Sequence, residues 1–195
     1  MQDDLLLKKI IKGLDKGKAL DVGAGDGSKS QILNDSGFEV LALEKNRDLI
    51  KKIGKRNIDF VCTDVLAFEF PPNEYALILA SASLDFLDRV EKEDILAKSF
   101  SSLKKKGSLA LFVFSKKDPL YQVAKSKWKE VKKETFEFPE TAKLHGKYIN
   151  YLDREEWQEL LETAGFKSIH IKEESIEDAH PTPHQHYIFQ ITAKK

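Results

Sequence analysis

The chain is poor in sulfur and carries no excess of charge of either sign. A single cysteine, Cys62, among 195 residues excludes an internal disulfide and a cysteine-rich metal site. The 32 basic and 32 acidic side chains cancel, so the overall basic field typical of nucleic-acid-binding proteins is absent. No apolar run approaches the roughly 20 residues of a membrane span, and the first residues are unlike a secretory signal. We therefore expect a soluble, cytoplasmic protein with no membrane partner.

The composition is that of a folded domain. Hydrophobic residues make up 41% of the chain and aromatic residues 10%, which suffices for a core and excludes global disorder. The length is that of one ordinary domain, so we expect a single domain over residues 1–195. A monomer is slightly favoured.

Strand and helix periods alternate along the first 114 residues. The apolar runs predict strands at 18–22, 38–43, 58–62, 75–80 and 108–114. Between them, and before the first, the spacing predicts helices near 7–14 and at 28–36, 47–53 and 94–103. This alternation favours an α/β fold whose parallel sheet is covered by helices on both faces.

The last third of the chain is less regular. Asp118 and Pro119 are typical of a helix start, and an apolar face continues from there to Val131. A second helix is predicted from Asp153 to Ala164. The segments 166–171 and 187–192 are predicted to be two closing strands.

A glycine-rich loop follows the first predicted strand. Gly23, Gly25 and Gly27 allow a sharp turn and let a ligand approach the backbone without Cβ atoms in the way. The next helix offers unpaired N–H groups. Ser28 stands where the dinucleotide fingerprint has its third glycine, and Asp21 just before the loop would serve a diphosphate poorly. The loop therefore predicts a ligand site of another kind, although it could also be a plain turn.

Two acids stand at the ends of the next strands. Glu44 ends the second predicted strand, about 20 residues after the loop, where it can accept two hydrogen bonds from ribose hydroxyls. Asp64 comes just past the third strand. Alone, Glu44 could cap the next helix and Asp64 could be a turn residue. Together with the loop they lie at the carboxyl edge of the sheet, which is the usual ligand crevice.

In this arrangement the sequence resembles the class I S-adenosylmethionine (SAM)-dependent methyltransferases, over nearly the whole chain. The segment 21–27 resembles the first motif of that family, Glu44 its ribose-binding acid, and Asp64 the acid that contacts the adenine amino group. The segment 75–83 resembles its fourth-strand motif. The segment 103–111 resembles its passage from helix to strand, with Lys106-Gly107 where Pro-Gly is usual.

The resemblance implies a doubly wound, mostly parallel seven-stranded sheet of order 3-2-1-4-5-7-6, with strand 7 antiparallel and helices on both faces. Residues 1–114 would form the cofactor-binding half, and 115–195 the half that covers the substrate and closes the sheet. The implied cofactor is SAM, with S-adenosylhomocysteine as product. The implied cofactor-binding residues are Asp21, Gly23, Ala24, Gly25, Asp26, Gly27, Glu44, Lys45, Asp64, Val65, Ala80 and Ser81.

The acceptor side is less specific. After the fourth strand the chain reads Ala80-Ser-Ala-Ser-Leu-Asp-Phe86, without the Asn/Asp-Pro-Pro-Tyr-like motif of many enzymes that methylate base amino groups. We therefore expect methyl transfer to a small-molecule acceptor by alignment and proximity, with a base needed only if the acceptor must lose a proton. The candidate catalytic residues are His145, Tyr148, Asp85 and His184, with Tyr151 as a further possible base.

A histidine-rich segment precedes the last predicted strand. His180, His184 and His186 could hold a metal, contact the substrate or lie in a plain loop. No cysteine or acidic motif nearby supports a metal, so none is expected. A similar entry to the last strand is found in methyltransferases that resemble the tellurite-resistance group, which gives a weak likeness to that group.

Other classes of function stay open. Seven lysines in 116–133 could face RNA, which makes an RNA methyltransferase the second hypothesis, although they could also form a solvated helix face. A third hypothesis is a non-catalytic SAM-binding regulatory or interaction protein. Cys62 is expected to be a packed thiol on a buried strand.

Overall fold

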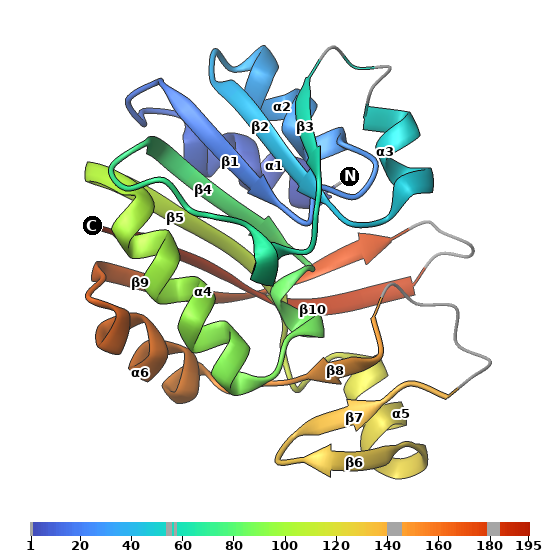
Figure 1. Ribbon diagram of the computed structural model, residues 1–195. Coiled ribbons are helices and arrows are strands. Elements are labelled where there is room, and N and C mark those ends of the chain that lie inside the picture. Colours follow the sequence, from blue (N-terminus) through green and yellow to red (C-terminus); the bar gives the residue numbers. More distant parts are fainter. Residues whose placement is uncertain (1, 54–55, 57, 140–145, 179–183) are drawn as a thin grey trace.

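Helices and strands alternate through the first two thirds of the computed structural model, which describes residues 2–53, 56, 58–139, 146–178 and 184–195 (Figure 1). The first elements are α1 (Gln2–Ile11), β1 (Lys18–Val22), α2 (Ser28–Asp35), β2 (Glu39–Glu44), α3 (Arg47–Ile53) and β3 (Asp59–Cys62). Next come the 3-10 helix η2 (Val65–Ala67), β4 (Tyr75–Ser81), the 3-10 helix η3 (Leu84–Phe86), α4 (Arg89–Ser102) and β5 (Leu103–Phe114). The remaining elements are α5 (Pro119–Lys127), β6 (Lys129–Lys132), β7 (Thr135–Glu137), β8 (Tyr148–Asn150), α6 (Arg154–Ala164), β9 (Lys167–Asp178) and β10 (His184–Lys194).

Seven strands form one sheet in the order β3-β2-β1-β4-β5-β10-β9. The five strands from β1 to β5 pair in parallel, whereas β10 runs antiparallel to both of its neighbours. Because β9 and β10 are the sixth and seventh strands of this sheet along the chain, the predicted order 3-2-1-4-5-7-6 and the reversed last strand are confirmed. The division of a single domain at residue 114 stays a prediction.

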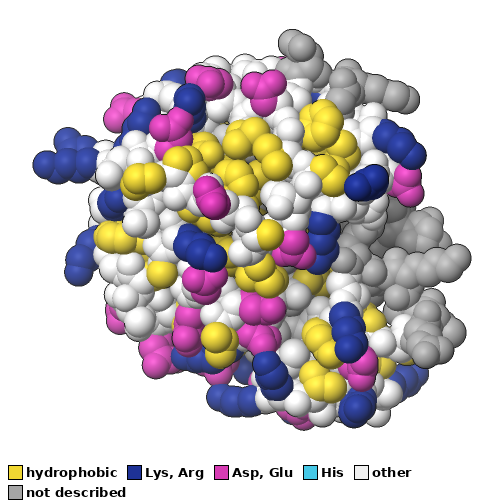
Figure 2. All heavy atoms as spheres, viewed as in Figure 1, with side chains coloured by type: hydrophobic (Ala, Val, Ile, Leu, Met, Phe, Trp, Pro, Cys, Tyr) yellow, Lys and Arg dark blue, Asp and Glu magenta, His cyan; other side chains and the backbone are white. Residues whose placement is uncertain are grey.

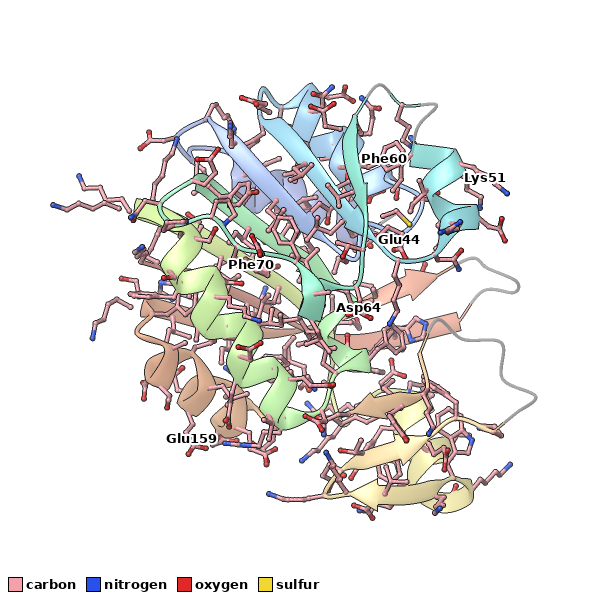
Figure 3. All side chains as sticks on the ribbon, in the orientation of Figure 1. Glu44, Lys51, Phe60, Asp64, Phe70 and Glu159 are labelled. Carbon is pink, nitrogen blue, oxygen red and sulfur yellow. The ribbon has the colours of Figure 1, made fainter. Side chains whose placement is uncertain are left out.

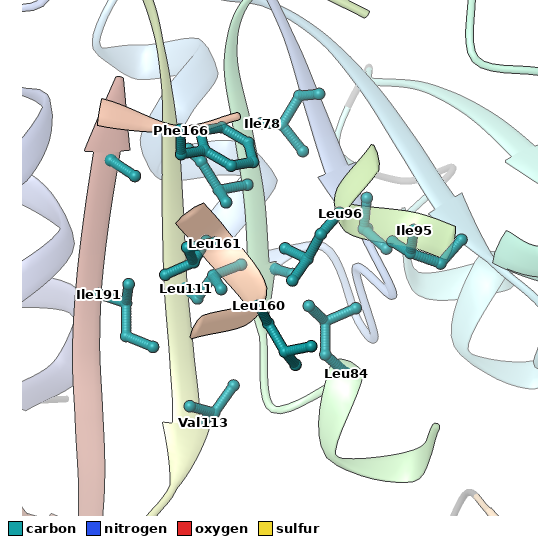
Figure 4. Packing of buried hydrophobic residues seen from close by; sticks show 14 of the residues in the cluster. Ile78, Leu84, Ile95, Leu96, Leu111, Val113, Leu160, Leu161, Phe166 and Ile191 are labelled. Carbon is teal, nitrogen blue, oxygen red and sulfur yellow. The ribbon is translucent and has the colours of Figure 1, made fainter. Parts of the chain in front are cut away.

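The sheet is covered on both faces because its central strands are apolar on both sides. On one face, Leu20 and Ile78 pack against residues of α4 and α6, including Ile95, Leu96 and Leu160 (Figure 4). On the other face, the neighbouring strand residues pack against Leu7 of α1, Leu33 of α2 and Ile53 of α3. Successive residues of a strand point to opposite faces, so β1 and β4 contribute to both cores. The parallel strand ends are thereby fixed side by side at one edge.

A second, three-stranded sheet was not predicted. The helix expected to continue to Val131 ends at Lys127, because Trp128 is extended (φ −103°, ψ 158°). Residues 129–132 instead pair with β7, which pairs in turn with β8. A small core forms between this sheet and α5 from Ala124, Phe136, Phe138, Ile149 and Tyr151. The predicted helical spacing was therefore right as far as Ala124 and wrong beyond it.

The lysine run after α4 also differs from prediction. The strand was predicted to begin at residue 108, but α4 ends at Ser102 and β5 already begins at Leu103, so residues 104–107 belong to β5. Gly107 is needed there, because a Cβ would lie 2.8 Å from the Lys104 carbonyl oxygen. At its other end α4 starts at Arg89, five residues before the predicted Asp94. A capping box between Asp88 and Glu91 fixes that start.

Candidate functional site

A cleft of about 880 Å³, counting the part open to solvent, lies at the carboxyl edge of the parallel strands. The carboxyl ends of four strands and the segments that follow them line it: Val22, Gly23 and Gly25 at β1; Leu43, Glu44, Lys45, Asn46 and Leu49 at β2; Thr63, Asp64 and Val65 at β3; and Ser81, Ala82, Ser83, Leu84, Phe86 and Leu87 at β4. Figure 3 shows Glu44 and Asp64 at the adjoining ends of β2 and β3.

Gly23 and Gly25, both in the loop after β1, are required for different reasons. Gly23 has a φ of +69°, and a Cβ there would lie 2.4 Å from the Cβ of Ser83. Its bare backbone therefore lets the segment after β4 pack closely, and the Ser83 hydroxyl donates to the Val22 carbonyl (2.7 Å). Gly25 has a φ of +61°, but a Cβ there would meet nothing within 4 Å. Gly25 lines the cleft, so its missing side chain leaves room for a ligand.

Glu44 ties the glycine loop to the start of α3. Its Oε2 accepts from the Gly25 N–H (2.9 Å), and its Oε1 accepts from the Asn46 N–H (2.7 Å). The side chain is buried, with 8% of the residue exposed, yet it lines the cleft. Each carboxylate oxygen has a second lone pair, so Glu44 can also accept from a ligand hydroxyl.

Asp64 and Lys45 form an ion pair at the cleft. The Lys45 ammonium lies 3.1 Å from Oδ2 of Asp64, whose Oδ1 accepts from the Leu66 N–H (3.1 Å). Partial burial by itself favours the neutral acid, but the Leu66 N–H and the Lys45 charge together hold the pKa of Asp64 below its usual value. Asp64 is thus an ionised acceptor at neutral pH.

Of the twelve predicted cofactor-binding residues, the cleft brings together Gly23, Gly25, Glu44, Lys45, Asp64, Val65 and Ser81. Five others do not line it: Asp21, Ala24, Asp26, Gly27 and Ala80. Asp21 is buried beneath the loop and accepts from the Ser30 hydroxyl, and Ala80 is buried in β4. Asp26 accepts from the Ser28 N–H at the start of α2. Asp21 and Asp26 thus bind residues of the first turn of α2 rather than face the cleft.

The titration of Asp21 gives a stability prediction. Burial raises the pKa of Asp21 from 3.8 to about 6, although the Ser30 hydrogen bond lowers it in part. A raised acid pKa means that the folded state holds this proton more tightly, so Asp21 lowers stability as pH rises from about 4 to 6. As the pH rises from 4 to 7, we expect the free energy of unfolding of Asp21→Asn to increase by about 2–3 kcal/mol relative to that of the unsubstituted chain. Urea unfolding at the two pH values measures this, with Asp35→Asn on the exposed side of α2 as control. An equal difference at both pH values would contradict it.

The candidate catalytic residues are dispersed. Asp85 is buried behind the cleft wall, where its Oδ1 accepts from the Phe114 N–H (2.9 Å). Tyr148 is half-buried on β8 and does not line the cleft, and Tyr151 is fully buried beside Phe136. His145 and the side chain of His184 lie outside the described residues.

The prediction of a packed Cys62 is wrong, because its thiol is exposed. All four residues of β3 are exposed, since β3 is the outermost strand of the sheet. Within the described ranges, no group of three or more His, Cys, Asp or Glu side chains is arranged to hold a metal ion. His180 lies outside these ranges. None of the described helices combines the length and the apolar character needed to cross a membrane.

Six of the seven lysines of 116–133 form ion pairs with nearby carboxylates. Lys116 lies 3.5 Å from Asp153 and from Glu156, and Lys125 lies 3.6 Å from Glu134. Further ion pairs of this segment are Lys117–Glu173, Lys129–Glu137, Lys132–Asp88 and Lys133–Glu156. Basic and acidic side chains are likewise interspersed over the face shown in Figure 2. This segment therefore does not form a continuous basic surface.

Comparison with known proteins places these features in a family. The family model of the methyltransferase domain matches residues 4–171. A SAM-dependent methyltransferase structure from Methanosarcina mazei has a TM-score of 0.77 at 20% identity, covering 96% of each chain. A 1,6-didemethyltoxoflavin-N1-methyltransferase from Burkholderia thailandensis, solved with that substrate and S-adenosylhomocysteine, has a TM-score of 0.66 at 19% identity, covering 100% of this chain and 76% of its own. These two likenesses confirm the fold.

A curated relative gives a stronger but shorter match. The chain is 33% identical over 101 residues to a demethylmenaquinone methyltransferase from Renibacterium salmoninarum. That match covers 50% of this chain and spans 41% of the relative's length. With the family model, it confirms the resemblance inferred from the sequence. The narrower likeness to the tellurite-resistance group stays a prediction.

Proposed function

The chain belongs to the methyltransferase domain family, and on that premise we propose that it transfers a methyl group from SAM to a small-molecule acceptor. SAM is the cofactor of the family's enzymes to which this chain is similar. The observation that carries the proposal concerns Gly25. A Cβ on this glycine would meet nothing within 4 Å, so it borders open space, and its N–H donates to the Glu44 carboxylate.

The residues of the cleft fit the parts of SAM. Glu44 would accept from the ribose hydroxyls, and Asp64 would accept from the adenine amino group beside Lys45. The apolar side chains of Leu43, Val65 and Leu87 would cover the adenine and keep water out.

Methyl transfer from SAM depends more on the positioning of the reactants than on reactive side chains. SAM supplies a methyl group that its sulfonium already makes electrophilic. The chain has to hold the acceptor in line with this methyl group, next to the Ser81–Leu87 wall of the cleft. That wall is itself fixed by the close contact between Gly23 and Ser83.

Two observations favour a small-molecule acceptor over RNA. The names of the demethylmenaquinone and didemethyltoxoflavin enzymes refer to small organic acceptors. Six of the seven lysines on which an RNA enzyme would depend are paired with carboxylates. A cytoplasmic location and a monomeric state stay predictions.

The direct test is to incubate the chain with methyl-labelled SAM and, separately, a cell metabolite extract and total RNA. We expect label in the metabolite pool and none in RNA. Binding of SAM and S-adenosylhomocysteine in the micromolar range with no label transfer to either pool would favour the non-catalytic hypothesis. Tighter binding of NAD than of SAM would overturn the cofactor assignment.

The lysine segment allows a sharper test against RNA. We expect the quadruple variant with Lys125, Lys127, Lys129 and Lys132 replaced by serine to keep SAM affinity and most of the methyl transfer. Label transfer is measured at low and moderate salt, because binding of RNA phosphates would weaken steeply with salt. Strong labelling of RNA that this variant loses would establish the RNA hypothesis instead.

A further inference from the structure

The charged side chains that line the cleft lie at the ends of β2 and β3. Among the described residues around the cleft, they are Glu44, Lys45 and Asp64. Lys45 and Asp64 pair with each other (3.1 Å), and Glu44 accepts from two backbone N–H groups. The wall that follows β4 is separated from them by β1, and its residues 81–87 present only uncharged side chains to the cleft. The one acid of that wall, Asp85, is buried and does not line the cleft.

This distribution of charge disfavours a charged group next to the wall after β4. Such a group would lose its water there without gaining an ion pair, which is costly in the interior of a protein. Leu84 and Phe86 instead offer apolar contact, and Ser81 and Ser83 offer neutral hydroxyl groups. The wall therefore favours an acceptor that is uncharged where it meets the methyl group.

The Phe86 ring is shared between the cleft and the three-stranded sheet. Phe86 lines the cleft and is half-buried. It also packs against the small core between that sheet and α5, where the centroid of its ring lies 6.2 Å from that of Phe138. The small core therefore holds the ring at the cleft wall, where it can contact the acceptor. Two aromatic rings in contact gain stabilisation beyond that of the area they bury, so Phe86 favours an aromatic neighbour.

Gly146, two residues before β8, leaves the space in which this ring lies. A Cβ on Gly146 would lie 3.0 Å from both Cβ and Cδ1 of Phe86, which is closer than such atoms normally approach. The φ of Gly146 lies outside the left-handed region, so space and not backbone conformation requires a glycine here. The segment that enters β8 thus determines where the Phe86 ring stands in the cleft wall.

We propose that Phe86 is a specificity-determining residue that selects a flat, uncharged aromatic compound as the acceptor, and that Gly146 positions its ring. The proposal rests on the proposed function and deepens it, because it names the chemical class of the small molecule. The acceptor packs against Phe86 and Leu84, and the Ser81 hydroxyl binds a polar substituent of its ring. Because Glu44 lies at the end of β2, beyond β1, binding of the acceptor and binding of SAM depend on different residues.

The first test compares the unsubstituted chain with Phe86→Ala, Phe86→Leu and Gly146→Ala. Methyl transfer from labelled SAM is measured over a dilution series of a cell metabolite extract, which separates the apparent KM for the acceptor from the maximal rate. SAM affinity is measured by calorimetry. We expect Phe86→Ala to raise the apparent KM by at least about tenfold with unchanged SAM affinity, and Phe86→Leu to raise it less.

Gly146→Ala should also raise the apparent KM, because the added Cβ displaces the Phe86 ring. In the double variant, Gly146→Ala should add little to the effect of Phe86→Ala, since the ring that it displaces is absent. Independent effects of the two substitutions would contradict the positioning role of Gly146. Phe60→Ala removes an exposed ring of β3 outside the cleft and is the matched control, which should change neither quantity.

The second test identifies the labelled product of the unsubstituted chain by mass spectrometry and NMR, and it decides even if no Phe86 variant folds. We expect the methyl group on an uncharged aromatic ring or on a substituent of that ring. Methyl transfer to an aliphatic amine, a carboxylate or a phosphate would overturn the inference and leave the proposed function intact. An unchanged apparent KM in a folded Phe86→Ala, or an equal loss of SAM affinity, would overturn the role of Phe86. Absence of transfer by the unsubstituted chain would overturn the proposed function, and this inference with it.

Discussion

Gly25→Val is expected to abolish SAM binding while the protein stays folded. The Gly25 backbone has a φ of +61° and its missing Cβ faces open cleft, so a valine side chain would occupy the space of the ligand. We expect at least about a 100-fold loss of affinity, equivalent to about 2.7 kcal/mol. Calorimetric titration with SAM and with S-adenosylhomocysteine measures the loss.

Strain alone could also weaken binding, and the chain offers a matched control for it. Gly13 after α1 has a φ of +105°, and a Cβ there would again meet nothing within 4 Å, but this glycine lies outside the cleft. Gly13→Val should therefore show a comparable loss of stability, about 1–3 kcal/mol, and unchanged SAM affinity. If a folded Gly25→Val bound SAM as tightly as Gly13→Val does, the loop would be only a turn.

The positions of the cleft residues after β1, β2 and β3 were predictable because their signals are local. Each loop residue directly follows a strand that the apolar pattern marks, and parallel strands bring their carboxyl ends to one edge. This logic placed Gly25, Glu44 and Asp64 at the same cleft. Asp21 does not line this cleft, because its side chain turns under the loop to Ser30, which the sequence does not reveal. Its role in cofactor binding stays a prediction.

The cleft wall after β4 and the contact between β10 and the start of α5 were not predictable in the same way. Ser83 reaches the cleft only because Gly23, 60 residues earlier, leaves room for it. No local pattern linked His186 to Asp118, which stands 68 positions earlier and lies 2.7 Å from it in the fold. Both contacts depend on how distant segments pack, which no local pattern contains.

The errors in secondary structure have the same origin. Residues 129–132 follow a helical apolar pattern, but strand pairing with β7 and β8 overrides it. The apolar letters of β3 suggested burial, yet β3 is an edge strand and its residues, including Phe60, are exposed. Local propensity predicted correctly whether most segments are helices or strands. The position of a strand in the sheet determined whether its side chains are buried.

Glu44→Ala is expected to weaken SAM binding by about 1.5–3 kcal/mol, which is about 10- to 150-fold in affinity. The first reason is the loss of charge-assisted hydrogen bonds to the ribose hydroxyls. The second is that the Gly25 and Asn46 N–H groups, which donate to Glu44, lose their partner, so the loop that frames the cleft is no longer held.

A second substitution separates these two reasons. Glu44→Gln keeps one carbonyl oxygen for a backbone N–H but removes the charge, so it should retain more stability than Glu44→Ala while still losing affinity. Glu39→Ala, at the other end of β2 and exposed, is the control and should change neither. Calorimetry with SAM and urea unfolding of the three variants measure affinity and stability. Unchanged SAM affinity in Glu44→Ala would show that Glu44 is not part of the SAM site, because alanine can accept neither from the loop N–H groups nor from the ribose hydroxyls.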